Sequence, residues 1–211
     1  HLQQKRKQTK QYIIILLLVL LIISITCGVV TNKELFIDNL AYKILVEKLR
    51  CPLLTKIMKI ITALSNTGVI ILIATFITLA LYQKNKKVAL TIPTNLALVA
   101  ILNQILKFIF HRPRPTGYRL LEIGGYSFPS GHAMASMAFY GFLIYLAHKF
   151  IKNNTIKKLI IILNILIIIL IGISRIYLGV HYCSDVLVGY SISIIYLMLY
   201  IKVLKKQKII K

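Results

Sequence analysis

Residues 159–185 read LIIILNILIIILIGISRIYLGVHYCSD. Apart from Asn164, positions 159–173 are apolar on every side of a helix, which suits surroundings of lipid rather than a water-facing surface. The run YIIILLLVLLIISITCGVV at 12–30 has the same character. The two runs predict an all-α protein that crosses a membrane several times.

Composition also indicates a membrane protein. Of the 211 residues, 58% are hydrophobic, whereas soluble domains contain about 45–50%. The chain holds 27 Lys and Arg against 5 Asp and Glu, a formal net charge of +22. In a soluble protein that charge would suggest nucleic acid as a partner. Here the basic residues cluster between and beyond the apolar runs, as the flanks of membrane spans do, so we expect a membrane and no nucleic acid.

Six apolar runs approach the roughly 20 residues that a bilayer requires, and they predict a polytopic bundle of six transmembrane helices. The runs are 12–30, 58–82, 88–110, 131–149, 157–177 and 182–203. The third carries Lys107 with two Asn and one Gln, so we expect it to face the bundle interior. Residues 33–57 mix charged with apolar positions at helical spacing, which predicts an amphipathic segment at the membrane interface. With no linker or repeat to divide it, the chain 1–211 is predicted to form a single membrane-embedded domain.

The positions of Lys and Arg predict the orientation. Sixteen basic residues and no acidic ones lie in the two terminal segments, in the connection between spans two and three, and in that between spans four and five. An even number of spans places all four segments on one side, which the positive-inside rule makes cytoplasmic, so both termini are expected there. The first connection is also basic, but it carries three of the five acidic residues, so we give it less weight as evidence for the orientation. The connections 31–57, 111–130 and 178–181 are then expected to face outward.

Three polar stretches fall at the outward ends of the last four spans. They are KFIFHRPRP (107–115), YSFPSGH (126–132) and SRIYLGVHYCSD (174–185). Their cations are Lys107, Arg114 and Arg175, and their imidazoles are His132 and His181. They also hold one carboxylate, Asp185, and a hydroxyl next to a glycine, Ser130 and Gly131. Three fixed cations suit an anion with several oxygens, such as phosphate. A Ser-Gly step at the start of a helix can add backbone N–H groups and the positive end of the helix dipole.

The histidines suit phosphoryl transfer. His181 and Asp185 are four residues apart, so on a helix they share a face. The carboxylate can hold one ring nitrogen as N–H and leave the other free to attack, while a second histidine protonates a leaving oxygen. No carboxylate cluster for a divalent metal lies near this face, and the three cysteines have neither metal-type nor paired spacing. The sequence therefore predicts no metal and no other cofactor, with the cations taking the place of Mg²⁺.

In these residues the chain resembles the type 2 phosphatidic acid phosphatase (PAP2) family. That family's signature is Lys-x6-Arg-Pro, then Pro-Ser-Gly-His, then Ser-Arg-x5-His-x3-Asp. The matching residues, in the same order and at the same spacings, are Lys107, Arg114, Pro115, Pro129, Ser130, Gly131, His132, Ser174, Arg175, His181 and Asp185. The resemblance covers roughly residues 10–205.

The resemblance implies a role for each position. His181 would be the nucleophile that forms a phosphohistidine, and Asp185 would orient it. His132 would protonate the leaving group and later activate water. The phosphate oxygens would be bound by Lys107, Arg114, Ser130, Gly131 and Arg175.

Other polar residues nearby have simpler explanations. Arg112, Arg119 and His111 lie outside the signature, and we expect them to meet lipid headgroups or solvent. Ser174 equally suits a hydrogen bond to a carbonyl one turn back in its own helix.

The predicted activity is hydrolysis of a terminal phosphate from a lipid phosphate or pyrophosphate in the cell membrane. A site outside the cytoplasm slightly favours undecaprenyl pyrophosphate, with phosphatidylglycerophosphate and phosphatidate as close alternatives. A lipid-linked phosphotransferase would use the same His181 with an acceptor other than water. A transporter would need a polar path through the membrane, and the inner halves of spans four to six are nearly free of polar residues.

Overall fold

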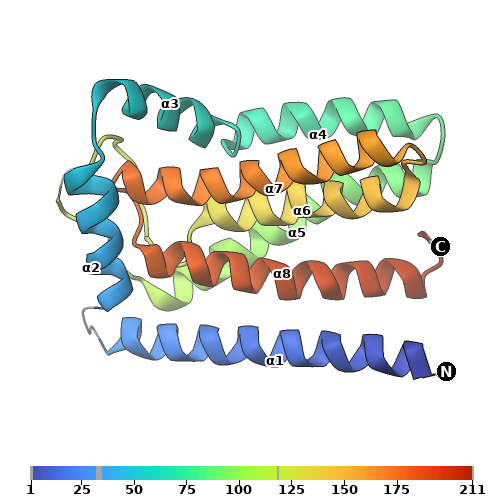
Figure 1. The fold of residues 1–211 in the computed structure, drawn as a ribbon, viewed down its shortest axis with the longest axis horizontal. Helices are drawn as coiled ribbons and strands as arrows, with labels where there is room; N and C mark the ends of the chain where they lie inside the picture. The colour runs from blue at the N-terminus through green and yellow to red at the C-terminus, as the bar shows by residue number, and fades with distance from the viewer. Residues whose placement is uncertain (1, 32–34, 118, 211) are drawn as a thin grey trace.

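The computed structural model describes residues 2–31, 35–117 and 119–210, and all regular secondary structure within them is helical. Lys33 and Glu34 of the predicted interfacial segment, and the basic residue Lys211, lie outside the described residues. The long helices are α1 (Leu2–Val30), α4 (Thr67–Tyr82), α5 (Lys86–Phe110), α6 (Gly131–Phe150), α7 (Asn154–Tyr177) and α8 (Cys183–Lys206). They run side by side, with both chain ends at the same end of the bundle (Figure 1). The predicted all-α bundle is confirmed.

Within the described ranges, four helices are long and apolar enough to cross a membrane: α1, α5, α7 and α8. The bent pair of α3 (Pro52–Ala63) and α4 makes a fifth candidate. Helix α6 is not among them, although it has 20 residues. It is richer in Gly, Ala, Ser and His, and it packs between α5, α7 and α8. The helical membrane bundle is therefore established, whereas the count of six spans stays a prediction.

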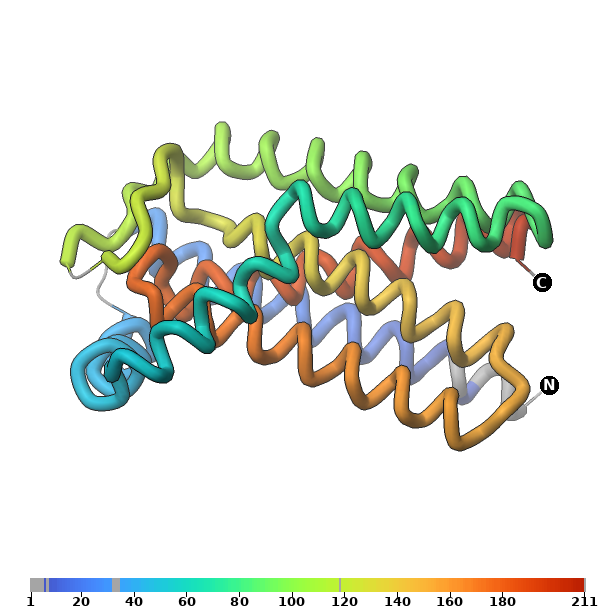
Figure 2. The backbone as a smooth tube through the Cα atoms, turned by 90° about the horizontal axis from the view of Figure 1, so that it is seen from above, coloured from blue at the N-terminus to red at the C-terminus, as the bar shows by residue number. Residues whose placement is uncertain are grey.

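The predicted span 58–82 is interrupted rather than straight. Helices α3 and α4 meet at an angle of 50°, and Figure 2 shows the change of direction between them. The last turn of α3 tightens, because the N–H groups of Leu64, Ser65 and Asn66 each bond a carbonyl three residues back. Asn66 then takes an extended backbone, and α4 begins after it. The break leaves Thr62 and Ser65 buried inside the bundle, whereas Asn66 is exposed.

The predicted interfacial segment is helical and lies across one end of the bundle. It comprises α2 (Phe36–Tyr42) and a π-helix, η1 (Lys43–Lys48), before α3 begins at Pro52. Figure 1 shows α2 nearly perpendicular to α1 and α8, at the end opposite the termini. Helix α2 packs on α8 and α7. This end of the bundle is therefore closed by a helix that runs across the others.

Small residues let α6, α7 and α8 approach closely. A Cβ on Gly172 of α7 would lie 2.8 Å from the side chain of Val186 in α8. A Cβ on Gly189 of α8 would lie 3.1 Å from the carbonyl oxygen of Ser130, just before α6. Glycine at such helix contacts is typical of membrane bundles. The close approach brings the N-terminal ends of α6 and α8 together.

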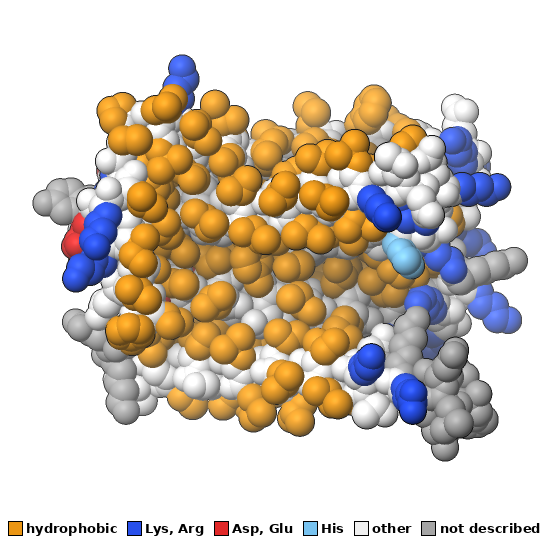
Figure 3. All heavy atoms as spheres, in the orientation of Figure 1, with side chains coloured by type: hydrophobic (Ala, Val, Ile, Leu, Met, Phe, Trp, Pro, Cys, Tyr) orange, Lys and Arg blue, Asp and Glu red, His pale blue; other side chains and the backbone are white. Residues whose placement is uncertain are grey.

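The outer surface has the distribution expected in a bilayer. Figure 3 shows an apolar band across the middle of the bundle, with Lys and Arg gathered at its ends. More of them lie at the end that holds the termini and the α4–α5 and α6–α7 connections (Figures 1 and 3). The chain is therefore a multi-pass membrane protein.

Candidate active site

The three polar stretches meet at the end of the bundle that α2 crosses. Helix α5 ends at His111, whose left-handed backbone (φ 47°) turns the chain into the loop 111–130. That loop leads to Ser130, whose N–H donates to the carbonyl of Asp185 at 3.1 Å. The start of α6 is thereby fastened to the first turn of α8. Three segments far apart in the sequence thus form one site.

His181 lies between a carboxylate and a guanidinium. Its Nδ1 is 3.3 Å from Oδ2 of Asp185, and its Nε2 is 3.2 Å from Nη1 of Arg114. An arginine can only donate, so Nε2 must accept and the ring proton must lie on Nδ1. Burial lowers the pKa of His181 from 6.5 to about 4, although the hydrogen bond from its ring to Asp185 opposes this. The imidazole is therefore neutral at neutral pH, with its lone pair on Nε2.

Asp185 is fully buried and accepts several hydrogen bonds. Its Oδ2 accepts from the backbone N–H of Tyr182 at 2.9 Å and from the hydroxyl of Ser127, besides the ring of His181. Its Oδ1 accepts from Nη1 of Arg112 at 2.6 Å. These donors compensate for the loss of water around the charged carboxylate. The carboxylate is thus held in one orientation toward His181.

Arg114 is fixed by backbone oxygens as well as by His181. Its Nε lies 3.1 Å from the carbonyl of Gly125, and its Nη1 lies 2.9 Å from that of Val180. Burial lowers the pKa of the Arg114 guanidinium from its ordinary value, and the charge of Asp185 opposes that change. The carbonyls of two different loops therefore hold this cation against Nε2 of His181.

Arg175 is buried with hydrogen-bonding capacity to spare. It is 1% exposed, and its Nη1 donates to the hydroxyl of Thr62 in α3 at 2.8 Å. Its Nε has no hydrogen-bond partner within the described part of the chain. An unsatisfied buried donor costs about 1–3 kcal/mol, and a bound anion would satisfy it. This arginine is therefore suited to hold an oxyanion.

His132 is positioned by the break between α3 and α4. Its Nε2 lies 3.0 Å from Oδ1 of Asn66, and its carbonyl accepts from the hydroxyl of Ser65 at 3.0 Å. The charges of Arg175, Arg114 and Lys107 and the ring of His181 all act on it. His132 is therefore close enough to His181 to interact with it and with the same arginines.

The remaining predicted phosphate ligands have structural partners. Lys107 donates from Nζ to the carbonyl of Tyr126. Ser130 is fully buried and caps α6, because its hydroxyl accepts from the N–H of Ala133 at 3.4 Å. A Cβ on Gly131 would lie 2.9 Å from Oδ1 of Asn103, so the start of α6 has no room for a larger residue. Across the described ranges, no group of three or more His, Cys, Asp or Glu side chains is placed to hold a metal ion.

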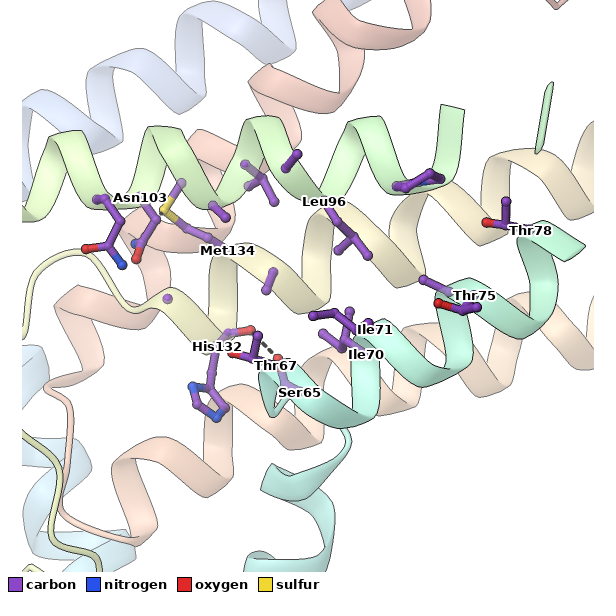
Figure 4. A pocket seen from close by; sticks show the side chains of 18 of the residues that line it. Ser65, Thr67, Ile70, Ile71, Thr75, Thr78, Leu96, Asn103, His132 and Met134 are labelled. Atoms are coloured by element: carbon purple, nitrogen blue, oxygen red, sulfur yellow. Dashed lines mark hydrogen bonds between the residues drawn. The ribbon is translucent and has the colours of Figure 1, made fainter. Parts of the chain in front are cut away.

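A cavity of about 590 Å³ extends from this site between α4, α5 and α6. Gly131 and His132 lie at one end of it, and mostly apolar side chains line the rest. Figure 4 shows His132 beside Ser65 and Thr67, with Ile70, Ile71 and Leu96 farther along. From Thr67 to Leu79 it follows about 18 Å of α4, at 1.5 Å per residue. Its shape and lining suit a hydrocarbon chain whose polar end reaches His132.

The structure corrects one expectation and adds residues that the sequence did not indicate. Arg112 was expected at headgroups or in solvent, and that is wrong: its side chain is 14% exposed and bonds Asp185 and Asp38. Asp38 is one of only 5 acidic residues in the chain, and that scarcity is the sequence feature that could have marked it as functional. Ser174 bonds the carbonyl of Ile171 in its own helix at 2.6 Å, which is the simpler of its two explanations.

Fold and site together define a helical membrane bundle with two histidines and buried arginines at one end, and comparison with known proteins gives its family. The sequence model of the PAP2 superfamily matches residues 88–209, so the chain belongs to the PAP2 superfamily. Phosphatidylglycerophosphatase B of Bacillus subtilis is 39% identical over 98 residues, which is 45% of this chain and 47% of that protein. An undecaprenyl-diphosphatase of Sulfolobus acidocaldarius is 28% identical over 121 residues, 54% of each chain. The matches thus span about half the length of these two relatives.

Solved structures agree over a larger part of the chain. The PAP2-type phosphatidylglycerolphosphate phosphatase of Bacillus subtilis superposes with a TM-score of 0.79 at 29% identity, covering 92% of this chain and 94% of that one. Aquifex aeolicus LpxE superposes with a TM-score of 0.63 at 27% identity, covering 80% of this chain and 96% of that one. The fold is therefore shared along nearly the whole chain with the Bacillus subtilis transmembrane phosphatase.

Proposed function

We propose that this protein hydrolyses the terminal phosphate of a membrane lipid phosphate or pyrophosphate through a phosphohistidine on His181. The observation that carries the proposal is the pair of hydrogen bonds on the His181 ring, to Asp185 at 3.3 Å and from Arg114 at 3.2 Å. They fix the proton on Nδ1 and the lone pair on Nε2, the arrangement that a nucleophilic imidazole needs.

The reaction follows from the residues around that lone pair. A phosphate group displaces Arg114 from Nε2, and the cations Arg114, Arg175 and Lys107 bind its oxygens. Nε2 forms a bond to phosphorus as the bond from phosphorus to the leaving oxygen breaks, and His132 gives that oxygen a proton. Water then attacks the phosphohistidine, loses a proton to His132 and releases inorganic phosphate.

The apolar cavity beside His132 supports a lipid as the substrate. The two leading candidate substrates are phosphatidylglycerophosphate and undecaprenyl pyrophosphate, because relatives are named for them. Phosphatidate is the third. An outward-facing site, proposed from the charge distribution, favours undecaprenyl pyrophosphate, whose phosphate would be removed on the outer side.

The test is a panel of these three lipids with the purified protein in detergent, scored by kcat/KM for release of inorganic phosphate. We expect turnover of at least one lipid, persistence of activity in excess EDTA, and inhibition by vanadate, which mimics five-coordinate phosphorus. Recovery of a phosphorylated acceptor in place of free phosphate would instead identify a lipid-linked phosphotransferase. Release of phosphate from none of the three lipids would contradict the proposal.

A further inference from the structure

Arg112 joins two carboxylates beneath the candidate site. Its Nη1 donates to Oδ1 of Asp185 at 2.6 Å and to the hydroxyl of Ser184 at 2.7 Å, and its Nη2 donates to Oδ2 of Asp38 at 3.0 Å. Its guanidinium carbon lies 3.9 Å from the centroid of the Tyr182 ring. With the side chain enclosed in this way, these charge-assisted hydrogen bonds are stronger than surface ion pairs.

Asp38 connects this arginine to the helix that crosses the bundle. It belongs to α2 and is 7% exposed. Its carboxylate also accepts from the backbone N–H and the hydroxyl of Ser184, both at 2.7 Å. Ser184 immediately precedes Asp185 in the first turn of α8, so α2 is fastened to the turn that carries the catalytic carboxylate. The loop after α5, α2 and α8 therefore share one buried network.

The two oxygens of Asp185 have separate tasks. Oδ1 faces Arg112, whereas Oδ2 faces the ring of His181 and the N–H of Tyr182. Rotation of the carboxylate would break the short bond to Arg112. Holding Oδ1 therefore keeps Oδ2 directed at Nδ1 of His181, which in turn keeps the lone pair on Nε2.

We propose that Arg112 and Asp38 are positioning residues for the reaction: Arg112 fixes the orientation of the Asp185 carboxylate, and Asp38 fixes Arg112. The inference rests on the proposed function, because it concerns the phosphoryl transfer assigned to His181. Neither residue touches the reacting atoms, and both act through Asp185.

The charges of the network explain why a second carboxylate is needed. When Nε2 attacks phosphorus and Nδ1 keeps its proton, the His181 ring gains positive charge. Asp185 stabilises that charge, but Arg112 alone would cancel its effect. Asp38 offsets Arg112, so the two carboxylates balance the arginine and the charged ring together.

The experiment compares Arg112→Gln, Arg112→Lys and Asp38→Asn with the wild type on the lipid that the wild type hydrolyses best. The matched control is Arg119→Gln, in the same loop, where Nε of Arg119 donates to the carbonyl of Pro115 at 2.5 Å. We expect kcat to fall roughly 10- to 100-fold in Arg112→Gln and Asp38→Asn, the range for losing a hydrogen bond to a charged group. KM should change little, Arg112→Lys should retain part of the rate, and Arg119→Gln should match the wild type.

The pH profile separates positioning from a role in folding alone. His181 is surrounded by Asp185 of α8, Arg175 of α7, His132 of α6, Arg114 of the loop and the adjacent Tyr182, and both variants keep all of these. Removing the Arg112 cation should move the acid limb of kcat/KM to higher pH. Removing the Asp38 anion should move it to lower pH. Loss of folding alone would not displace the limb in opposite directions.

Thermal unfolding in detergent identifies the variants that fold. If Arg112→Gln does not fold, Arg112→Lys and Asp38→Asn carry the comparison of kcat, because each keeps the charge or the shape of the original, and Asp38→Asn carries the pH comparison, with a shift of its acid limb to lower pH still expected. A folded Arg112→Gln or Asp38→Asn protein with the kcat of the wild type overturns the inference, as does a shift of the acid limb in the same direction in both. An inactive wild type would contradict the proposed function instead.

Discussion

Nη1 of Arg114 donates to Nε2 of His181 at a distance of 3.2 Å. The nitrogen proposed to attack phosphorus therefore already faces a cation, and the bond must open before the attack. A phosphate that displaces it would find Arg114 within reach of its oxygens. The same contact keeps the ring proton on Nδ1, beside Asp185. The site thus holds the proposed nucleophile in the tautomer that the reaction would need before a substrate binds.

Replacing His181 by alanine should abolish turnover. The expected loss is at least about 10³-fold, a lower bound set beside the larger loss that follows removal of the serine nucleophile from a hydrolase triad. Release of phosphate measures the loss, and the wild type quenched during turnover should carry acid-labile phosphate on His181. Such phosphate on any other residue would contradict the assignment. His148→Gln, an exposed histidine near the other end of α6, is the control.

His132→Ala should stop multiple turnovers but still form the phosphoenzyme from an aryl phosphate, whose leaving group needs little protonation. Asn66→Ala should slow turnover in the same direction but less, because it removes only the 3.0 Å hydrogen bond to His132. Rapid quench with labelled substrate measures both. The control is Asn164→Ala, since Asn164 bonds the carbonyl of Ile160 in its own helix at 2.7 Å. Full multiple turnover by His132→Ala would remove this histidine from the mechanism.

Phosphoenzyme formation should persist to acid pH. Burial lowers the pKa of His181 to about 4, so the ring stays neutral and nucleophilic until the pH approaches 4. Single-turnover rates with an aryl phosphate in the His132→Ala background isolate this group. A midpoint near 6.5 would contradict the expectation.

The same lowered pKa has a consequence for stability. Below pH 6.5 the unfolded chain binds a proton on this ring that the folded chain binds only near pH 4. The contribution of His181 to the free energy of unfolding therefore falls as the pH drops from 6.5 to about 4, and it is constant above and below that window.

Filling the cavity should discriminate between long and short substrates. Ala97→Phe adds a ring to the wall of the cavity on α5. We expect a rise in KM of roughly tenfold for long-chain lipids, the scale of losing part of an apolar contact area, with little change for a water-soluble aryl phosphate. The lipid panel measures this, and Leu98→Phe, an exposed neighbour outside the cavity lining, is the control. Equal effects on both substrates would contradict binding of the lipid chain there.

The sidedness of the site can be read from cysteine labelling in a background without Cys27, Cys51 and Cys183. Gly124→Cys is suitable because Gly124 is exposed and a Cβ there has nothing within 4 Å. It should react with a membrane-impermeant maleimide on intact cells. Lys152→Cys, in the exposed α6–α7 connection, should react only after the membrane is opened. The reverse pattern would place the site on the cytoplasmic side and favour phosphatidylglycerophosphate or phosphatidate.

The sequence by itself determined the class of fold and the chemical inventory of the site. Runs that are apolar on every side can be stable only in lipid or deep in a bundle, so hydropathy alone predicts helices such as α7 and α8. The spacing of His181 and Asp185 is a local property of one chain segment, and their contact was foreseeable from it. The cations proposed to bind phosphate were likewise indicated by their residue types and their places at the ends of spans.

Only the tertiary structure decided which of these groups touch one another. Asp38 and Ser184 bond across 146 residues of sequence, and Thr62 and Arg175 across 113. No local periodicity encodes such pairs, because they depend on how α2 crosses the bundle and where α3 ends. The polar turn at Leu64–Asn66 also has no strong helix-breaking residue, yet it brings Asn66 to His132. Local patterns fix each helix through the solvation of its own side chains, whereas contacts between distant helices follow from how the complete set of side chains packs together.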